Sequence, residues 1–210
     1  MRLSKAAYYS DFVVYALLVA MGCAVDIWRD TASAASIWLL WAFVGVLSWT
    51  LVEYPLHRCV LHRIRIFAAM HDAHHQMPLA FIGTPTWLSL GVILGVVFLP
   101  VWALGSFRTA SGLTVGVMAG FLWYGIVHHA IHYRRPRVIA TWLLLASRRH
   151  AQHHYACQPG NFGVTTAFWG GVFGTSSQSL NARAAYNPSA EGSARIPSPA
   201  MGECRGKTKT

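Results

Sequence analysis

Residues 113–132, LTVGVMAGFLWYGIVHHAIH, join an uncharged apolar run to a cluster of histidines. The apolar part, about Leu113 to Val127, contains no charged side chain, and one charge at the centre of a bilayer costs roughly 2.5–3.5 kcal/mol on insertion scales. We therefore expect a membrane helix that carries imidazoles at its end. The composition agrees, because 54% of the 210 residues are hydrophobic and 11% are charged, against roughly 25% charged residues in soluble domains.

Three other apolar runs predict further membrane spans. The first follows Arg2 and Lys5, so a cleaved signal peptide is the alternative interpretation, but no clear cleavage site precedes Asp26 and a retained helix is favoured. The link at 105–112 is short enough to make the last two spans a helical hairpin. The three runs are about Phe12–Trp28, Ala34–Val52 and Trp87–Leu104.

A further helix is expected from about Val138 to Tyr155, lying in or near the membrane interface with its polar end in the cytoplasm. From residue 176 onward the chain is rich in Ser, Ala, Asn, Pro and Lys. Such a composition buries too little apolar surface to fold. The sequence thus predicts a membrane-embedded domain at 1–175 and a disordered polar tail at 176–210.

Four spans place the N-terminus, residues 53–86 and everything after His128 on one side of the membrane. Of the 17 Lys and Arg residues, only Arg29 and Arg108 fall on the other side. By the positive-inside rule, both termini and all the histidine clusters are cytoplasmic. The net charge of +10 then reflects topology. Nucleic-acid binding is not expected, because the chain has no soluble basic face.

All eleven histidines fall in four clusters, and neutral imidazole is the commonest side-chain metal ligand. Ten of them follow the spacings H-x4-H, H-x2-HH, H-x3-H and H-x2-HH, while His129 is interpreted as a bystander. Ten nitrogens exceed the roughly four ligands of one structural zinc, so two metals are predicted. The ten candidate ligands are His57, His62, His71, His74, His75, His128, His132, His150, His153 and His154.

Helical spacing explains most of these clusters, because residues three or four apart share one face. His57 and His62 are the exception: five residues apart, they point roughly 140° away from each other on an ideal α-helix. They converge only if the helix ends or bends, and Pro55 makes a bend plausible. Imidazole suits zinc, copper, iron and nickel alike, whereas calcium and magnesium prefer oxygen ligands. A thiolate from Cys59 or Cys157 is the less favoured addition.

Two further sets of candidate site residues are chosen for their positions near the histidine clusters. Metal-bound imidazoles need an acceptor or donor at their other nitrogen, and the candidates for this role are Glu53, Asp72, Tyr155 and Asn161. For the two acids, pairing with nearby arginines is the alternative. Apolar side chains near the clusters that are candidates to bind a substrate are Phe81, Trp87, Trp123 and Phe162, with core or lipid-facing packing as the alternative.

The chain resembles the fatty acid hydroxylase superfamily, which includes fatty-acid 2-hydroxylases, sterol desaturases and carotene hydroxylases. The segments that carry the resemblance are EYPLHRCVLH at 53–62, HDAHH at 71–75, HHAIH at 128–132, RHAQHH at 149–154 and NFGVTTAFWGGVFGT at 161–175. One departure is visible: Gly170 follows Trp169, where family members commonly carry Asp.

The resemblance implies an all-α integral membrane protein of about four transmembrane helices, with a cytosolic helical cap that holds two metals. It also implies the ten histidines above as ligands of two iron ions, with zinc possible in isolated protein. The activity implied is that of a lipid hydroxylase, acting on a fatty acid or fatty-acyl chain in lipid biosynthesis. It would use O2 and electrons from an external reductase, ferredoxin or cytochrome.

Three other functions remain as alternatives. One is a sterol, hopanoid or carotenoid hydroxylase or desaturase of the same superfamily. A haem-binding membrane cytochrome would need histidines paired across spans near haem depth, whereas these lie past the span ends. A metal transporter would need ionisable residues within its spans, and the third and fourth runs contain none.

Overall fold

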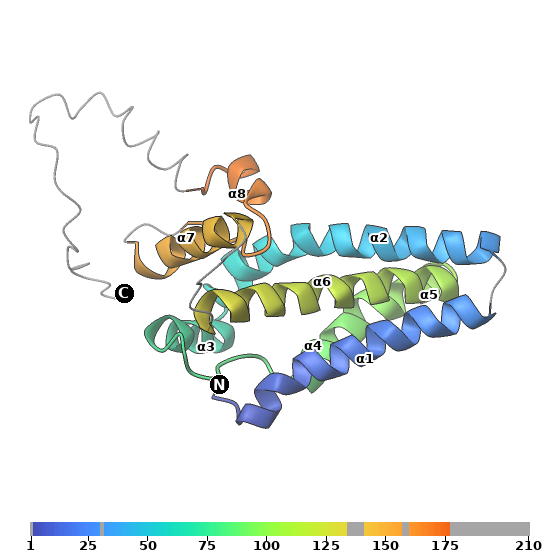
Figure 1. The fold of residues 1–210 in the computed structure, drawn as a ribbon, viewed down its shortest axis with the longest axis horizontal. Coiled ribbons are helices and arrows are strands. Elements are labelled where there is room, and N and C mark those ends of the chain that lie inside the picture. The colour runs from blue at the N-terminus through green and yellow to red at the C-terminus, as the bar shows by residue number, and fades with distance from the viewer. Residues whose placement is uncertain (1, 30–31, 134–140, 157–159, 177–210) are drawn as a thin grey trace, which may run out of the picture.

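The computed structural model describes residues 2–29, 32–133, 141–156 and 160–176 of the chain. In these ranges the regular secondary structure is helical, apart from one isolated β-bridge between Arg2 and Ile82. Four helical spans are long and apolar enough to cross a membrane. They lie side by side as an elongated bundle (Figure 1), which confirms the predicted all-α membrane architecture. The expected tail at 176–210 lies outside the described residues, except for Ser176.

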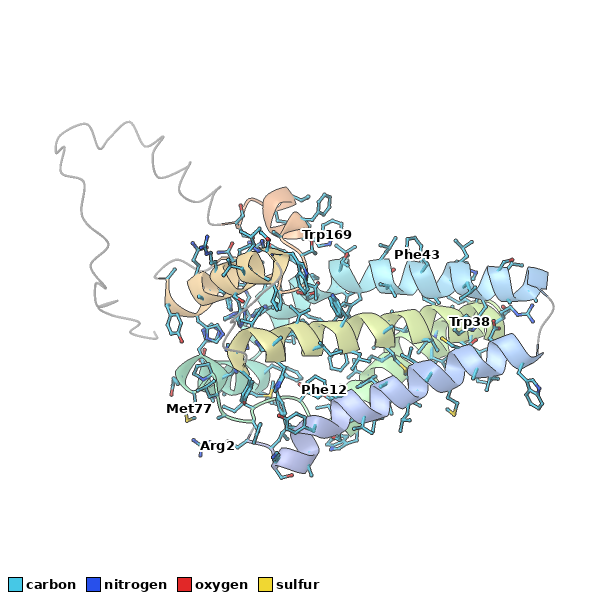
Figure 2. All side chains as sticks on the ribbon, viewed as in Figure 1. Arg2, Phe12, Trp38, Phe43, Met77 and Trp169 are labelled. Carbon is cyan, nitrogen blue, oxygen red and sulfur yellow. The ribbon has the colours of Figure 1, made fainter. Side chains whose placement is uncertain are left out.

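The first two spans are longer than the apolar runs indicated. Helix α1 covers Lys5–Arg29 and α2 covers Ala32–Pro55. Many large apolar side chains on them face away from the protein; Phe43, 60% exposed, points outward from α2 (Figure 2). Such exposure suits lipid contact, because a soluble surface rarely presents so large an apolar area.

The third span is built from three consecutive helical segments. These are α4, Thr86–Ile93, the π-helix η2, Leu94–Phe98, and α5, Leu99–Leu104. Pro100 lies just after the π-helical turn. A proline inside a helix lacks an N–H and clashes with the carbonyl four residues earlier, and a π-turn widens the helix at such a place. The span therefore continues past Pro100 instead of ending there.

The fourth span, α6 at Phe107–Tyr133, packs against α2 through glycines. A Cβ added at Gly116 would lie 1.9 Å from the carbonyl oxygen of Ala42, and one added at Gly45 would lie 2.2 Å from that of Leu113. Small residues allow membrane helices to approach backbone to backbone. This close contact sets the distance between the histidines that follow α2 and those at the end of α6.

Side chains from all four spans meet in a small core of Tyr15, Trp49, Ile93, Val117 and Met118. Beyond one end of the bundle lie three shorter helices: α3, Arg65–Gln76, α7, Thr141–Tyr155, and α8, Phe168–Val172. The N-terminus lies at this same end (Figure 1). The predicted interfacial helix corresponds to α7, and the predicted cap corresponds to these three helices.

Candidate metal centre

The first two histidines lie on a turn that the sequence did not reveal. Residues Leu56–Leu61 form a π-helix, η1, and His62 caps it. Hydrogen bonds in a π-helix join residues five apart, so His57 and His62 come onto one face, with their rings stacked 5.4 Å apart at 12°. The bend expected at Pro55 is therefore not what aligns them. The H-x4-H spacing was the available signal for this π-turn.

Nine of the ten predicted ligands fall into two groups, and within each group the ligand atoms lie within 4.8 Å of one another. One group gathers His57 of η1, His62 at the C-terminal end of η1, His71 of α3 and His153 of α7. The other gathers His74 of α3, His128 and His132 of α6, and His150 and His154 of α7. Metal–nitrogen bonds of about 2.0–2.1 Å place nitrogens on one ion up to roughly 4.2 Å apart. Both groups therefore approach the dimensions of a metal site.

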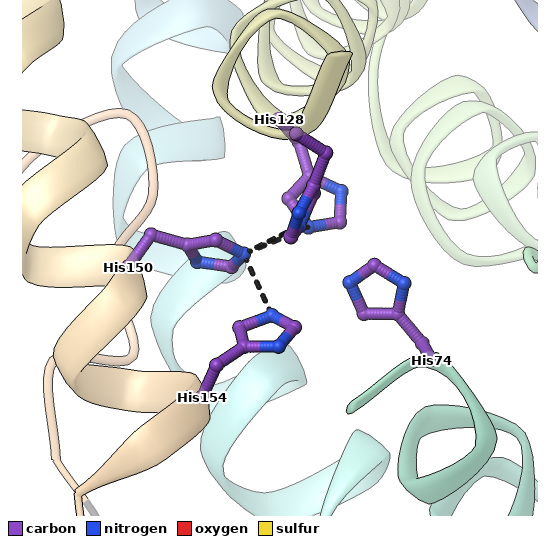
Figure 3. A group of neighbouring side chains, drawn as sticks. His74, His128, His150 and His154 are labelled. Atoms are coloured by element: carbon purple, nitrogen blue, oxygen red, sulfur yellow. Dashed lines mark hydrogen bonds between the residues drawn. The ribbon is translucent and has the colours of Figure 1, made fainter. Parts of the chain in front are cut away.

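The second group shows why hydrogen bonds alone do not account for this geometry. Nε2 of His150 lies 3.1 Å from Nε2 of His128, 2.9 Å from that of His132 and 3.0 Å from that of His154. A neutral imidazole nitrogen carries either one proton or one lone pair, so one atom cannot satisfy three such partners. His74 faces them from α3 (Figure 3), and its buried Nε2 has no hydrogen-bond partner in the described part of the chain. A shared cation fits these converging lone pairs.

The first group is oriented by backbone carbonyls. Nδ1–H of His57 donates to the carbonyl oxygen of Phe162 at 2.6 Å, and Nδ1–H of His153 donates to that of Gly160 at 2.8 Å. Since a carbonyl only accepts, the proton of each ring sits on Nδ1 and the lone pair of Nε2 points toward the other histidines. This is the tautomer that a metal ligand requires.

His75 lies between the two groups. Its Nε2 is 3.0 Å from Nε2 of His71, and its ring stacks on His154 at 4.2 Å. His129 lies outside both groups, with its Nδ1 3.2 Å from the hydroxyl of Tyr8. The position of His129 agrees with its interpretation as a bystander.

The local electrostatics keep His71, His74, His150 and His154 neutral. Burial, reinforced by the neighbouring histidines, lowers the pKa of His74 to about 3 and that of His154 to about 2. Burial and neighbouring histidines also lower the pKa values of His71 and His150. Neutral imidazole is the form that binds metal, so the site is ready to coordinate at neutral pH.

The loop at 160–165 positions the first group, and Glu53 holds this loop. One carboxylate oxygen of Glu53 accepts the N–H groups of Val164 at 2.5 Å and of Thr165 at 3.0 Å, and the other accepts the hydroxyl of Thr165. Glu53 is 2% exposed. The sequence predicted that Glu53 contacts an imidazole directly. In the structure Glu53 instead binds the loop whose carbonyls, at Gly160 and Phe162, accept from the imidazoles.

Asn161 also supports the loop. It adopts a left-handed backbone with φ 53°, which Asn tolerates better than most residues. Its N–H donates to the carbonyl oxygen of Thr175 at 3.0 Å, and its side-chain amide donates to Gln152 at 3.1 Å. Asp72 lies half-buried on α3 between two ligand candidates, and Tyr155 is 70% exposed with its ring 5.8 Å from that of His154. Their roles at the metal stay predictions.

A cavity of about 410 Å³ opens beside the histidines. Its wall includes His57 and His71 of the first group and His74 and His128 of the second, and most of the remainder is apolar side chains of the four spans. The four residues predicted to bind a substrate do not line this cavity. Phe162 is buried against the rings of His57 and His153, Phe81 packs on Tyr8, Trp87 is 73% exposed, and Trp123 lines a separate hollow of about 300 Å³. Their role in substrate binding stays a prediction.

Sequence comparison agrees with this picture. The model of the family described as "Fatty acid hydroxylase" matches residues 42–175. The chain belongs to the fatty acid hydroxylase family. It is 32% identical to the dihydroceramide fatty acyl 2-hydroxylase FAH2 of Arabidopsis thaliana, over 62% of this chain and 58% of that protein.

Two further relatives extend the comparison. The chain is 26% identical to the ceramide very long chain fatty acid hydroxylase scs7 of Schizosaccharomyces pombe, over 85% of this chain and 53% of that protein. A solved structure of full-length scs7p, with only its hydroxylase domain visible, matches with a TM-score of 0.68 and 26% identity, covering 81% of this chain and 66% of that one. The chain thus spans a little over half the length of these curated relatives.

Proposed function

We propose that this chain is a membrane-bound, O2-dependent hydroxylase of a fatty-acyl chain. One observation carries the proposal: both histidine groups reach the wall of one apolar cavity between the membrane spans. A metal pair would therefore meet an alkyl chain that enters from the lipid. We place this catalytic domain at residues 1–175.

The ten predicted ligand histidines fit two irons, which would supply the reduction of O2 when bound, a task that redox-inactive zinc does not perform. Zinc remains possible in isolated protein. The overall reaction would place one oxygen atom of O2 in a C–H bond and release the other as water, with two electrons from an external reductase, ferredoxin or cytochrome and two protons from solvent. The positive-inside distribution supports a cytoplasmic position for the histidine groups, where such a donor has access.

The protein's own residues would position the chain and exclude water. Leu56, Val60 and Leu61 on η1 and Phe67 on α3 line the cavity next to the histidines, and apolar walls keep water from a reactive oxidant. The relatives named above are hydroxylases of fatty acids or fatty-acyl chains. We therefore place an acyl chain ahead of a sterol, hopanoid or carotenoid substrate.

The test is lipid mass spectrometry of cells that express the chain. We expect one class of acyl lipid to gain the mass of one oxygen atom. The gain should disappear in His150→Ala, because Nε2 of His150 lies at the centre of the second group. His129→Gln is the matched control, since His129 adjoins a ligand in sequence but lies outside both groups. No oxidised lipid with wild-type protein, or full activity of His150→Ala, would refute the proposal.

A further inference from the structure

The cavity wall holds an acid that the metal groups do not use. On α1, four residues with helical spacing line the cavity: Tyr8, Asp11, Phe12 and Tyr15. Asp11 lies within the first membrane span, Lys5–Asp26. Ionisable side chains within membrane spans are costly and mark functional sites, so the position of Asp11 calls for a partner.

The other polar groups of this face are already paired. The hydroxyl of Tyr8 contacts Nδ1 of His129 at 3.2 Å, and the hydroxyl of Tyr15 donates to Oγ of Ser89 at 2.9 Å. The carboxyl group of Asp11 has one side-chain hydrogen bond, to Thr86, but its Oδ1 is buried and has no hydrogen-bond partner in the described part of the chain. A buried acceptor without a donor is unfavourable, and the space beside Asp11 is the cavity itself.

Asp11 also lies close to the level of the metal groups. Helix α1 meets α6 there: Tyr8 reaches His129, and the ring of Phe12 lies 3.7 Å from a Cβ built at Gly125. Gly125 precedes His128 by three residues, which is about one helical turn. An acyl lipid that is oxidised close to its polar head group, with that carbon at the histidines, would thus bring the head group into the cavity that Asp11 lines.

We propose that Asp11 is a specificity-determining residue of the acyl hydroxylase, an inference that rests on the proposed function. Its free carboxylate oxygen accepts a hydrogen bond from the hydroxyl or amide N–H of a neutral lipid head group. The same carboxylate repels a lipid that ends in a carboxylate, because like charges in a poorly solvated cavity interact strongly. The favoured substrate is then a neutral acyl lipid with a hydrogen-bond donor, and a free fatty acid is disfavoured.

The test measures binding, so that it does not depend on turnover. Protein in lipid nanodiscs is titrated with tritiated N-palmitoyl ethanolamine and with tritiated palmitate at about pH 8, where a free carboxyl group is ionised. Wild-type protein is expected to favour the amide. Asp11→Asn keeps the size of the side chain and removes its charge, and should reduce this preference about tenfold or more. Partition of each ligand into the bilayer cancels when the variants are compared.

Asp26→Asn is the matched control. It removes an acid from the same helix, about 22 Å farther along its axis, and Asp26 does not line the cavity. The inference is overturned if the ratio of the two dissociation constants is the same in wild-type and Asp11→Asn protein, or if Asp26→Asn changes it equally. A ratio that depends on Asp11 in a protein that oxidises no lipid would keep this inference and reject the proposed reaction.

Discussion

Replacement of Glu53 tests whether the loop at 160–165 holds the first histidine group in place. Glu53→Ala would leave the buried N–H of Val164 and that of Thr165 without their acceptor. Each unsatisfied buried group costs about 1–3 kcal/mol. The hydroxyl of Thr165 can turn to another partner, and removal of a buried carboxylate returns part of the cost. We expect a net loss of about 2–5 kcal/mol of stability.

The loss should extend to metal binding. The same loop carries the carbonyls that fix the tautomers of His57 and His153, and loss of such partners typically weakens metal affinity 10–100-fold. Glu53→Gln retains one acceptor oxygen for the two N–H groups, so its effect should be smaller, about 1 kcal/mol. The assay is metal content by mass spectrometry after dialysis against graded chelator, with thermal unfolding in detergent alongside.

A variant that destabilises the bundle far from this loop separates the two effects. Gly22→Ala introduces a Cβ 2.7 Å from a side-chain methyl group of Val115, between α1 and α6, and should lower stability without altering metal affinity in the protein that remains folded. If Glu53→Ala binds metal as tightly as wild type, or if Gly22→Ala loses metal to the same degree, the positioning role of Glu53 is wrong.

Three other outcomes are expected. Metal-free protein should lose thermal stability as the pH falls below 6.5 toward about 3, because unfolded histidines take up protons there while His74 stays neutral when folded; an unfolding temperature that is constant or rises over this range would contradict the burial of the site. Gly116→Ala should lower the unfolding temperature more than Gly91→Ala, because a Cβ at Gly91 meets nothing within 4 Å; equal unfolding temperatures would count against the tight contact between α2 and α6. Truncation after Thr175 should leave lipid oxidation nearly unchanged, since the tail composition cannot bury a core; loss of activity in this variant would show that the tail contributes to the domain.

The sequence alone determined the number of membrane spans and the position of the histidine clusters at one end of the spans. Long apolar runs with few charges are typical of membrane-spanning helices. The histidine spacings of α3, α6 and α7 follow from the helical repeat. The family resemblance rested on these same motifs, and the match over residues 42–175 bears it out.

The tertiary structure decided what depends on contacts between distant segments. The division of the histidines between two groups and the link from Glu53 to the loop at 160–165 join residues up to 112 positions apart. Local periodicity does not report such pairings, because they arise from the close approach of α2 and α6 and the placement of the cap over them. Asp11 belongs to the same class: in the sequence it is one acid near the start of an apolar run, and only the packing of α1 turns it toward the cavity.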